Sequence, residues 1–401
     1  GSEMCIRDRD MSVPSSHDAK PRGRKVSVVL GVILVGVVIA AVALGRGLLP
    51  FGGGDSGGAA GGSGGKLTQL HGVIGSEKRA YFEDPDVVAR LEELGYSVSV
   101  TTAGSRQIAT TTDIAEQDFV FPSSAPATQK VREQGSGYSV DFPFFTPMAV
   151  ASWKPIADLL VAEGVVSEQN GAYTLDVNKY MDLARSGKRW RDLGEAYPSP
   201  RNVQIRSTDI RTSNSAAMYL SLLAWEVAER DPERRDDVVF LIDEIAPFFT
   251  AQGYSEASSS GPFTDYLSQG MGAAPMVMVY EAQFLGEQMR PNSRIRDDMV
   301  LLHLSPTVLA NHGIVGVSAG GKELGRLLSN DPQLQQLAAR HGFRPANSGS
   351  LADELADRGF DAPSDYVNSI DPPSYDRLEQ LIDGVGQRYA GAPAPVKEDD
   401  Q

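Results

Sequence analysis

Short hydrophobic runs alternate with amphipathic stretches through most of the chain after residue 66. The short runs have the two-residue period of strands, and the longer stretches repeat every three to four residues, as helices do. The first unit predicts a strand within 70–84, a helix at 86–95 and a strand at 97–104. This alternation favours an α/β fold over a sandwich or a helical bundle.

The same pattern continues to the end of the folded part. Residues 118–133 predict a short strand and a helix, and 138–153 form one long extended apolar run before a helix at 154–164. Pro143 and Pro147 interrupt the long run, which suits a crossing segment better than a central strand. Further strands are expected at 202–209, 275–284, 298–306 and 313–320, and helices at 215–229, 262–270 and 322–330.

An uncharged apolar stretch at 26–45 precedes the folded part. Its length is what a helix needs to cross a bilayer. Basic residues precede the stretch, so the positive-inside rule places 11–25 in the cytoplasm and the folded part outside the cell membrane as a single-pass protein. A cleaved signal peptide is the alternative, and it also exports the folded part.

Three other segments are not expected to belong to the folded part. Residues 1–10 precede Met11 and are interpreted as foreign to the natural protein, which would remove Cys5, the one cysteine of the chain. Residues 46–65 read as a flexible Gly/Ser linker, and 391–401 as a disordered acidic tail.

Composition excludes several classes of function. The net charge of -15 argues against nucleic-acid binding, and a lone cysteine leaves no disulfide framework or thiol nucleophile. The five histidines show no metal-ligand spacing, so neither a metal nor another cofactor is expected.

Small polar residues fill four predicted strand-to-helix turns. In an open α/β sheet such turns face a crevice, where helix N-termini and hydroxyls favour an anion. Arginines would add charge, and nearby acids would orient them or bind a ligand amine. Ordinary helix capping is the competing explanation for each turn. The candidates from these turns are Ser76, Ser105, Arg106, Ser123, Ser124, Asp209, Arg211, Thr212, Ser213 and Ser215, with Lys78 as a further cation and Glu281 as a further acid.

Four segments together resemble bacterial extracellular solute-binding proteins of the type II periplasmic binding fold: 144–160, 206–224, 266–285 and 304–344. The resemblance implies two α/β lobes joined by crossing strands near 144–148 and 301–306. Lobe one would comprise 66–145 plus 305–390, and lobe two 146–304. The family's ligand turns would fall on Ser76, Ser105, Ser123, Thr146, Thr212, Ser213, Ser215 and Tyr280.

The predicted function is therefore capture of a small anionic ligand by lobe closure, without catalysis. The protein would act as a monomer and serve a membrane transporter or a surface partner. One alternative is a surface module that uses the same fold to bind protein partners. Another is a serine hydrolase, because residues 316–320 match GxSxG and a triad of Ser318, Asp331 and His341 can be drafted.

Overall fold

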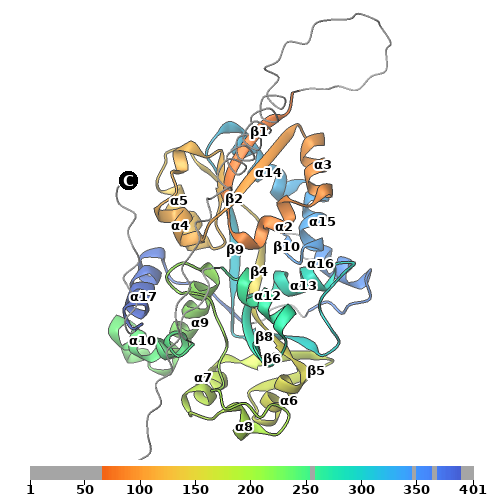
Figure 1. Cartoon of the computed structure of the whole chain (residues 1–401). Helices are drawn as coiled ribbons and strands as arrows, with labels where there is room; N and C mark the ends of the chain where they lie inside the picture. Colours follow the sequence, from red (N-terminus) through yellow and green to blue (C-terminus); the bar gives the residue numbers. More distant parts are fainter. Residues whose placement is uncertain (1–65, 253–257, 346–348, 364–367, 390–401) are drawn as a thin grey trace, which may run out of the picture. The chain divides into compact units, whose positions relative to one another are not determined.

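The computed structural model describes residues 66–252, 258–345, 349–363 and 368–389 (Figure 1). They form a mixed α/β fold around an eleven-stranded sheet, as the sequence pattern predicts. The segments 1–10, 11–25, 26–45, 46–65 and 391–401 lie outside the described residues. Among the helices of the described ranges, none has both the length and the apolar character needed to span a bilayer.

One half of the sheet is built around β1 (Thr68–Ile74). Strands β2 (Tyr96–Thr102) and β3 (Phe119–Phe121) flank β1 and run parallel to it, and β3 pairs antiparallel with β9 (Thr307–Gly316). Each parallel strand is followed by a short helix, so the carboxyl ends of β1, β2 and β3 bring three turns to the same edge.

Strand β4 (Ser139–Trp153) joins the two halves of the sheet. Its first part pairs with β9, and its second part lies between β7 (Met276–Tyr280) and β8 (Met299–Ser305). Figure 1 labels β4, β8 and β9. The register between β4 and β9 shifts between Asp141 and Phe144, the interval that contains Pro143, whereas Pro147 pairs in register with Leu309. β4 is nevertheless one continuous strand in the middle of the sheet, so the two prolines do not keep it out of a central position.

The second half of the sheet ends in a hairpin that the sequence analysis did not predict. Strand β6 (Ala172–Asp176) pairs with β8 and with β5 (Val166–Gln169). The turn between β5 and β6 is Asn170-Gly171, with φ of 52° and 79°. Asn and Gly tolerate these positive angles better than other residues, and the pair is typical of two-residue hairpins.

Three strand predictions are wrong in whole or in part. The strand expected at 313–320 is β9, which ends at Gly316, before a helix that begins at Ala319. Residues 202–209 form only isolated bridges, which pair Asn202 with Arg189 and Arg206 with Val277. Strand β7 stops at Tyr280 rather than at residue 284, because helix α13 (Glu281–Gln288) begins there. The main-chain N–H of Tyr280 donates to the side chain of Gln283 at 3.1 Å, a capping contact that turns the chain into the helix.

The remaining helices cover the sheet and its ends, and two remaining short strands pair with β4 and β9. They are η1 (Ser76–Lys78), α2 (Arg79–Phe82), α3 (Pro85–Glu93), α4 (Ser105–Thr110), η2 (Ile114–Glu116), α5 (Ala125–Arg132), α6 (Lys154–Ala162), α7 (Val177–Arg185), α8 (Trp190–Leu193), α9 (Asn214–Arg230), η3 (Pro232–Arg234), α10 (Val238–Ile245), α11 (Pro247–Thr250), α12 (Ser260–Gln269), α14 (Ala319–Asn330), α15 (Pro332–Arg340), β10 (Arg344–Pro345), α16 (Gly349–Ala356), β11 (Ser369–Ile370) and α17 (Tyr375–Gln387).

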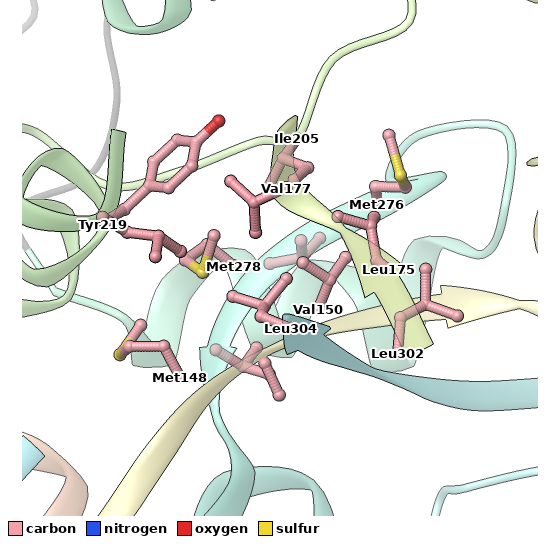
Figure 2. Close-up of a cluster of buried hydrophobic side chains, with 14 of the residues drawn as sticks. Met148, Val150, Leu175, Val177, Ile205, Tyr219, Met276, Met278, Leu302 and Leu304 are labelled. Carbon is pink, nitrogen blue, oxygen red and sulfur yellow. The ribbon is translucent and has the colours of Figure 1, made fainter. Parts of the chain in front are cut away.

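Buried apolar side chains hold each half of the sheet against its helices. Figure 2 shows the cluster of the second half, where Met148 of β4 and Met278 of β7 pack near Leu304 of β8 and Tyr219 of α9. Two separate clusters fill the first half. These cores keep the strand ends in place, so the turns that leave them have defined positions.

Candidate ligand-binding site

Polar turns from both halves of the sheet meet at one small cavity, which we call the ligand cavity. Its volume is about 40 Å³. A single water needs only about 10–15 Å³ by the same kind of measure, so the cavity has room for a group of a few heavy atoms. It is lined by Gly75, Ser76, Glu77, Ala103, Gly104, Ser105, Ser123, Ser213, Asn214, Ser258, Ser259 and Tyr280.

Several helices begin at this cavity: α4, α5, α9 and α12. Their N-cap residues are Gly104, Ser124, Ser213 and Ser259, and none of the four makes a side-chain capping bond. Ordinary helix capping therefore does not explain why serine occurs at Ser124, Ser213 and Ser259. The first-turn N–H groups of a helix have no partner within the helix, and together with the helix dipole they favour an anion.

A buried charged cluster lies directly behind one wall of the cavity. The ammonium Nζ of Lys78, which is fully buried, lies 2.5 Å from Glu77 Oε1, 2.8 Å from Ser123 Oγ and 2.9 Å from His312 Nδ1. The hydroxyl of Ser123 also donates to Glu77 Oε1. Glu77 and Ser123 line the cavity, whereas Lys78 and His312 do not, so Lys78 acts on the cavity through these two neighbours.

The carboxylate of Glu77 is ionised. Burial alone would raise its pKa, but the Lys78 ammonium and the hydrogen bonds from Lys78 and Ser123 lower the pKa to about 2. Burial moves the pKa of His312 well below its usual value, and the Lys78 charge acts in the same direction. His312 is therefore neutral, with Nδ1 accepting from Lys78 and Nε2 carrying the proton. Within the described residues Nε2 is buried without a hydrogen-bond partner.

Direct contacts close the cavity between its two sides. The hydroxyls of Ser76 and Ser258 lie 2.8 Å apart. The side-chain amide of Asn214 donates to the main-chain oxygen of Ser123 at 3.2 Å and to the Tyr280 hydroxyl at 2.9 Å. At Gly104 a Cβ atom would lie 2.3 Å from the carbonyl oxygen of Thr212, so only glycine permits this approach.

The structure brings five of the sequence-predicted site residues to the ligand cavity: Ser76, Ser105, Ser123, Ser213 and Tyr280. Ser124 and Arg106 line a neighbouring cavity of about 20 Å³ that also touches Ser213. The sequence-predicted turns thus converge, although they come from segments far apart along the chain.

The predicted arginines make ion pairs with carboxylates. The guanidinium of Arg106 lies 2.7 Å from both Glu379 and Asp383 of α17. Arg211 pairs with Asp209 at 2.5 Å. Neither arginine lines the ligand cavity.

Four other predicted residues do not line the cavity. Thr146 Oγ1 accepts from the main-chain N–H of Ala282 at 3.0 Å, and the Ser215 hydroxyl lies 2.8 Å from Thr208 Oγ1. Glu281 is buried in a bidentate pair with Arg344, at 2.7 and 3.1 Å. Thr212 contributes its main-chain oxygen to the contact with Gly104.

Sequence reasoning missed four polar residues of the cavity: Glu77, Asn214, Ser258 and Ser259. Glu77 stands between two residues that were considered, Ser76 and Lys78, and Asn214 stands between Ser213 and Ser215. The run of three serines at 258–260, directly before a predicted helix, was a signal of the same kind as the other turns.

The residues of the drafted hydrolase triad each have another partner. The Ser318 hydroxyl caps α14 by accepting from the Gly321 N–H at 3.1 Å. Asp331 pairs with Arg90 at 2.6 Å, and His341 Nε2 lies 2.8 Å from Asp84. Within the part of the chain that the structure describes, no group of three His, Cys, Asp or Glu residues could hold a metal ion.

Comparisons with known proteins assign the fold. No family model matches the sequence, and no curated protein matches it. Among solved structures, the sulfate-binding protein SubI from Mycobacterium tuberculosis H37Rv is similar, with a TM-score of 0.50 and 16% identity over 78% of this chain and 96% of that chain. A periplasmic thiamin-binding protein gives a TM-score of 0.49 and 11% identity, over 83% of this chain and 100% of that one.

A periplasmic molybdate-binding protein from Azotobacter vinelandii has a TM-score of 0.40 and 12% identity, over 68% of this chain and 98% of that chain. The chain has the fold of type II periplasmic binding proteins. At such low identities the likeness concerns the fold alone.

Proposed function

We propose that the protein captures a small anionic solute in the ligand cavity by closure of two lobes, without catalysis. The observation that carries the proposal is the convergence of serine-bearing turns and four helix N-termini on one cavity. Neutral donors at helix N-termini are well suited to a small oxyanion, because they supply hydrogen bonds without a bulky countercharge.

The two lobes would be 66–145 with 305–390, and 146–304. The pairing of β4 with both halves of the sheet supports crossings near 144–148 and 301–306. The contact between Ser76 and Ser258 would join the lobes in a closed state, and it would break when they open. Closure removes water from the cavity, which strengthens each hydrogen bond to the ligand.

The ionised Glu77 narrows the ligand class. An anion that has only acceptor oxygens would be repelled by the Glu77 carboxylate, because neither group has a proton to donate. An oxyanion that keeps one proton can donate a hydrogen bond to this carboxylate. The similar structure from M. tuberculosis is described as sulfate-binding, and sulfate has no such proton at neutral pH. We therefore expect this protein to prefer a protonated oxyanion such as hydrogen phosphate over sulfate.

The protein would work outside the cytoplasm, anchored by a single span at 26–45 with its N-terminus inside. The uncharged stretch and the basic residues before it support this arrangement. Captured ligand would pass to a membrane transporter, or ligand binding would be sensed by a surface partner, with the protein acting as a monomer.

Thermal unfolding with a panel of anions tests the proposal. A ligand that binds only the native state at 100 times its Kd adds about 2.7 kcal/mol of stability. We expect hydrogen phosphate to raise the Tm more than sulfate. Ser213→Ala should reduce the rise, while Ser167→Ala, on the exposed face of β5, should not. If phosphate, sulfate and carboxylates all leave the Tm unchanged, the proposal fails.

A further inference from the structure

Two adjoining pockets form a groove beside the start of β7, and this groove shares no residue with the ligand cavity. Their volumes are about 570 and 350 Å³, and Asn202, Gln204 and Ala251 line both of them. We call this surface the arginine groove, defined by its arginines and side-chain amides: Arg185, Arg189, Arg201, Asn202, Gln204 and Arg206.

The two ends of the groove differ in chemistry. The smaller pocket has an apolar wall made by Ala184, Pro247 and Phe248, with Arg185 beside it. The larger pocket holds the other three arginines of the groove. No acidic residue is among the described residues that line either pocket, although the whole chain carries a net charge of -15. A concave surface of one sign concentrates groups of the other sign.

Two of the four arginines have their charge balanced by carboxylates of the fold. Arg185 pairs with Glu244 at 2.8 Å, and Arg206 pairs with Asp265 at 2.9 Å. Arg201 instead donates to main-chain oxygens. Within the described ranges neither Arg201 nor Arg189 pairs with a carboxylate, so the larger pocket holds two positive charges that these ranges do not balance.

The backbone holds the polar side of the groove in place. In the extended segment 202–206, Val203 and Ile205 are each 1% exposed, and the alternate residues Asn202, Gln204 and Arg206 line the groove. Isolated bridges tie this segment to Arg189 and to β7. A segment that enters the groove therefore meets side chains that are already arranged, which lowers the entropic cost of binding.

The described part of the chain ends beside the apolar end of the groove. After α17, the side chain of Arg388 pairs with Asp243 of α10, and the next residue of α10, Glu244, pairs with Arg185 of the smaller pocket. The Cα atoms of consecutive residues are only about 3.8 Å apart, so the last turn of α17 and the smaller pocket hold the same point of α10. Residues 390–401, which follow, can span up to about 40 Å when extended, enough to pass along both pockets.

We propose that residues 390–401 of this chain occupy the arginine groove of the same molecule. The order of their chemistry matches the order of the pockets: the apolar run Pro-Ala-Pro-Val at 393–396 would reach the apolar wall first, and Glu-Asp-Asp at 398–400 would then reach Arg189 and Arg201. Arginine forks bind carboxylates in bidentate fashion, and the amides of Asn202 and Gln204 can both donate to and accept from a peptide backbone.

The covalent connection favours this occupant over a segment of another protein. A segment tethered by a few residues has an effective concentration in the millimolar range at its site, which a free partner would have to exceed. The tail would therefore shield the two unbalanced arginines from other acidic groups. The inference is independent of what the ligand cavity binds.

A labelled peptide with the sequence of residues 390–401 tests whether the tail fills the groove. Fluorescence anisotropy would measure its binding to a variant that ends at Tyr389, to the full chain, and to a full chain with Glu398→Gln, Asp399→Asn and Asp400→Asn. We expect saturable binding to the shortened variant that weakens at high salt, and binding at least about tenfold weaker to the full chain, whose own tail competes. The full chain with the neutralised tail should recover the binding.

Two double variants, made in the chain that ends at Tyr389, locate the binding. Arg189→Gln with Arg201→Gln should weaken peptide binding at least about tenfold, because charge-assisted hydrogen bonds are lost. Arg79→Gln with Arg326→Gln removes the same charge from exposed positions elsewhere and should change binding little.

Three results would each overturn the proposal. The first is that the peptide does not bind the shortened variant at low salt. The second is that the peptide binds the full chain as tightly as the shortened variant, which would mean that the groove is open to a partner instead. The third is that both double variants weaken binding alike, because the peptide would then be held by general charge and not by the groove.

Discussion

The ligand cavity and the arginine groove treat charge in opposite ways. At the cavity, the charges of Glu77 and Lys78 are buried and paired with each other. They determine which neighbouring groups donate and which accept hydrogen bonds, and together they add no net charge. In the groove, Arg189 and Arg201 are exposed and have no carboxylate partner in the described ranges. The first arrangement suits selection of a small ligand by its hydrogen bonds, and the second suits attraction of a larger acidic one.

This difference has an energetic consequence. A buried charge that loses its partner keeps its full desolvation cost, whereas an exposed charge is solvated and screened with or without a partner. Substitutions in the cavity wall should therefore change the free energy of unfolding, and substitutions in the groove should change binding alone.

The largest effect is expected for Lys78→Met. It leaves the ionised Glu77 buried without its ammonium partner, which should reduce the free energy of unfolding by about 3–5 kcal/mol. Adding Glu77→Gln should recover part of this loss, because the uncompensated charge is then removed. Urea unfolding measures both. Lys154→Met removes a half-exposed lysine that pairs with Asp158 and should cost no more than about 1 kcal/mol. Equal losses for Lys78 and Lys154 would contradict this account of the cavity.

A pH effect of intermediate size should come from His312. The pKa of this buried histidine is well below its usual value, and Lys78, Glu77 and Tyr280 surround it. Below about pH 6.5 the unfolded chain takes up a proton that the folded chain does not, so stability falls as the pH decreases.

The expected slope is about 1.4 kcal/mol per pH unit for each such histidine. Burial also lowers the pKa of His303 and of His341, so they contribute in the same direction. Urea unfolding at pH 7.5 and pH 5.5 should show a smaller difference for His312→Asn than for the unchanged protein. An unchanged slope in His312→Asn would contradict a neutral His312.

The smallest effect on stability is expected in the groove. Arg189→Gln with Arg201→Gln should leave the free energy of unfolding within about 0.5 kcal/mol, as is usual for exposed positions. Urea unfolding checks this on the same samples used for peptide binding. A loss of several kcal/mol would mean that these arginines serve the fold rather than a ligand.

The sequence predicted much of the fold because its strands are strongly periodic. β1, β3 with α5, and the long β4 all lie where their hydrophobic runs indicated. The strand prediction for residues 202–209 was wrong because alternating apolar and polar residues show only that one face of the segment is buried. In the structure this segment pairs with the neighbouring backbone through isolated bridges and does not form a strand. The β5 and β6 hairpin was missed although Asn170-Gly171 is a strong turn signal.

The candidate site was predictable in its serines and not in its charges. Helix N-termini after parallel strands must share an edge, so Ser76, Ser105 and Ser123 could be expected to converge. Whether a charged side chain faces a cavity or pairs elsewhere depends on tertiary contacts. Arg106 pairs with α17, which lies more than two hundred residues later, and no local pattern could indicate that.

A crystal structure with arsenate tests the central claim most directly, because arsenate keeps a proton at neutral pH and its arsenic atom can be located by anomalous scattering. We predict arsenic density in the ligand cavity, with oxygens within hydrogen-bond distance of Ser123, Ser213 and Glu77. An empty cavity in crystals that bind arsenate elsewhere, for example at the arginine groove, would contradict the claim.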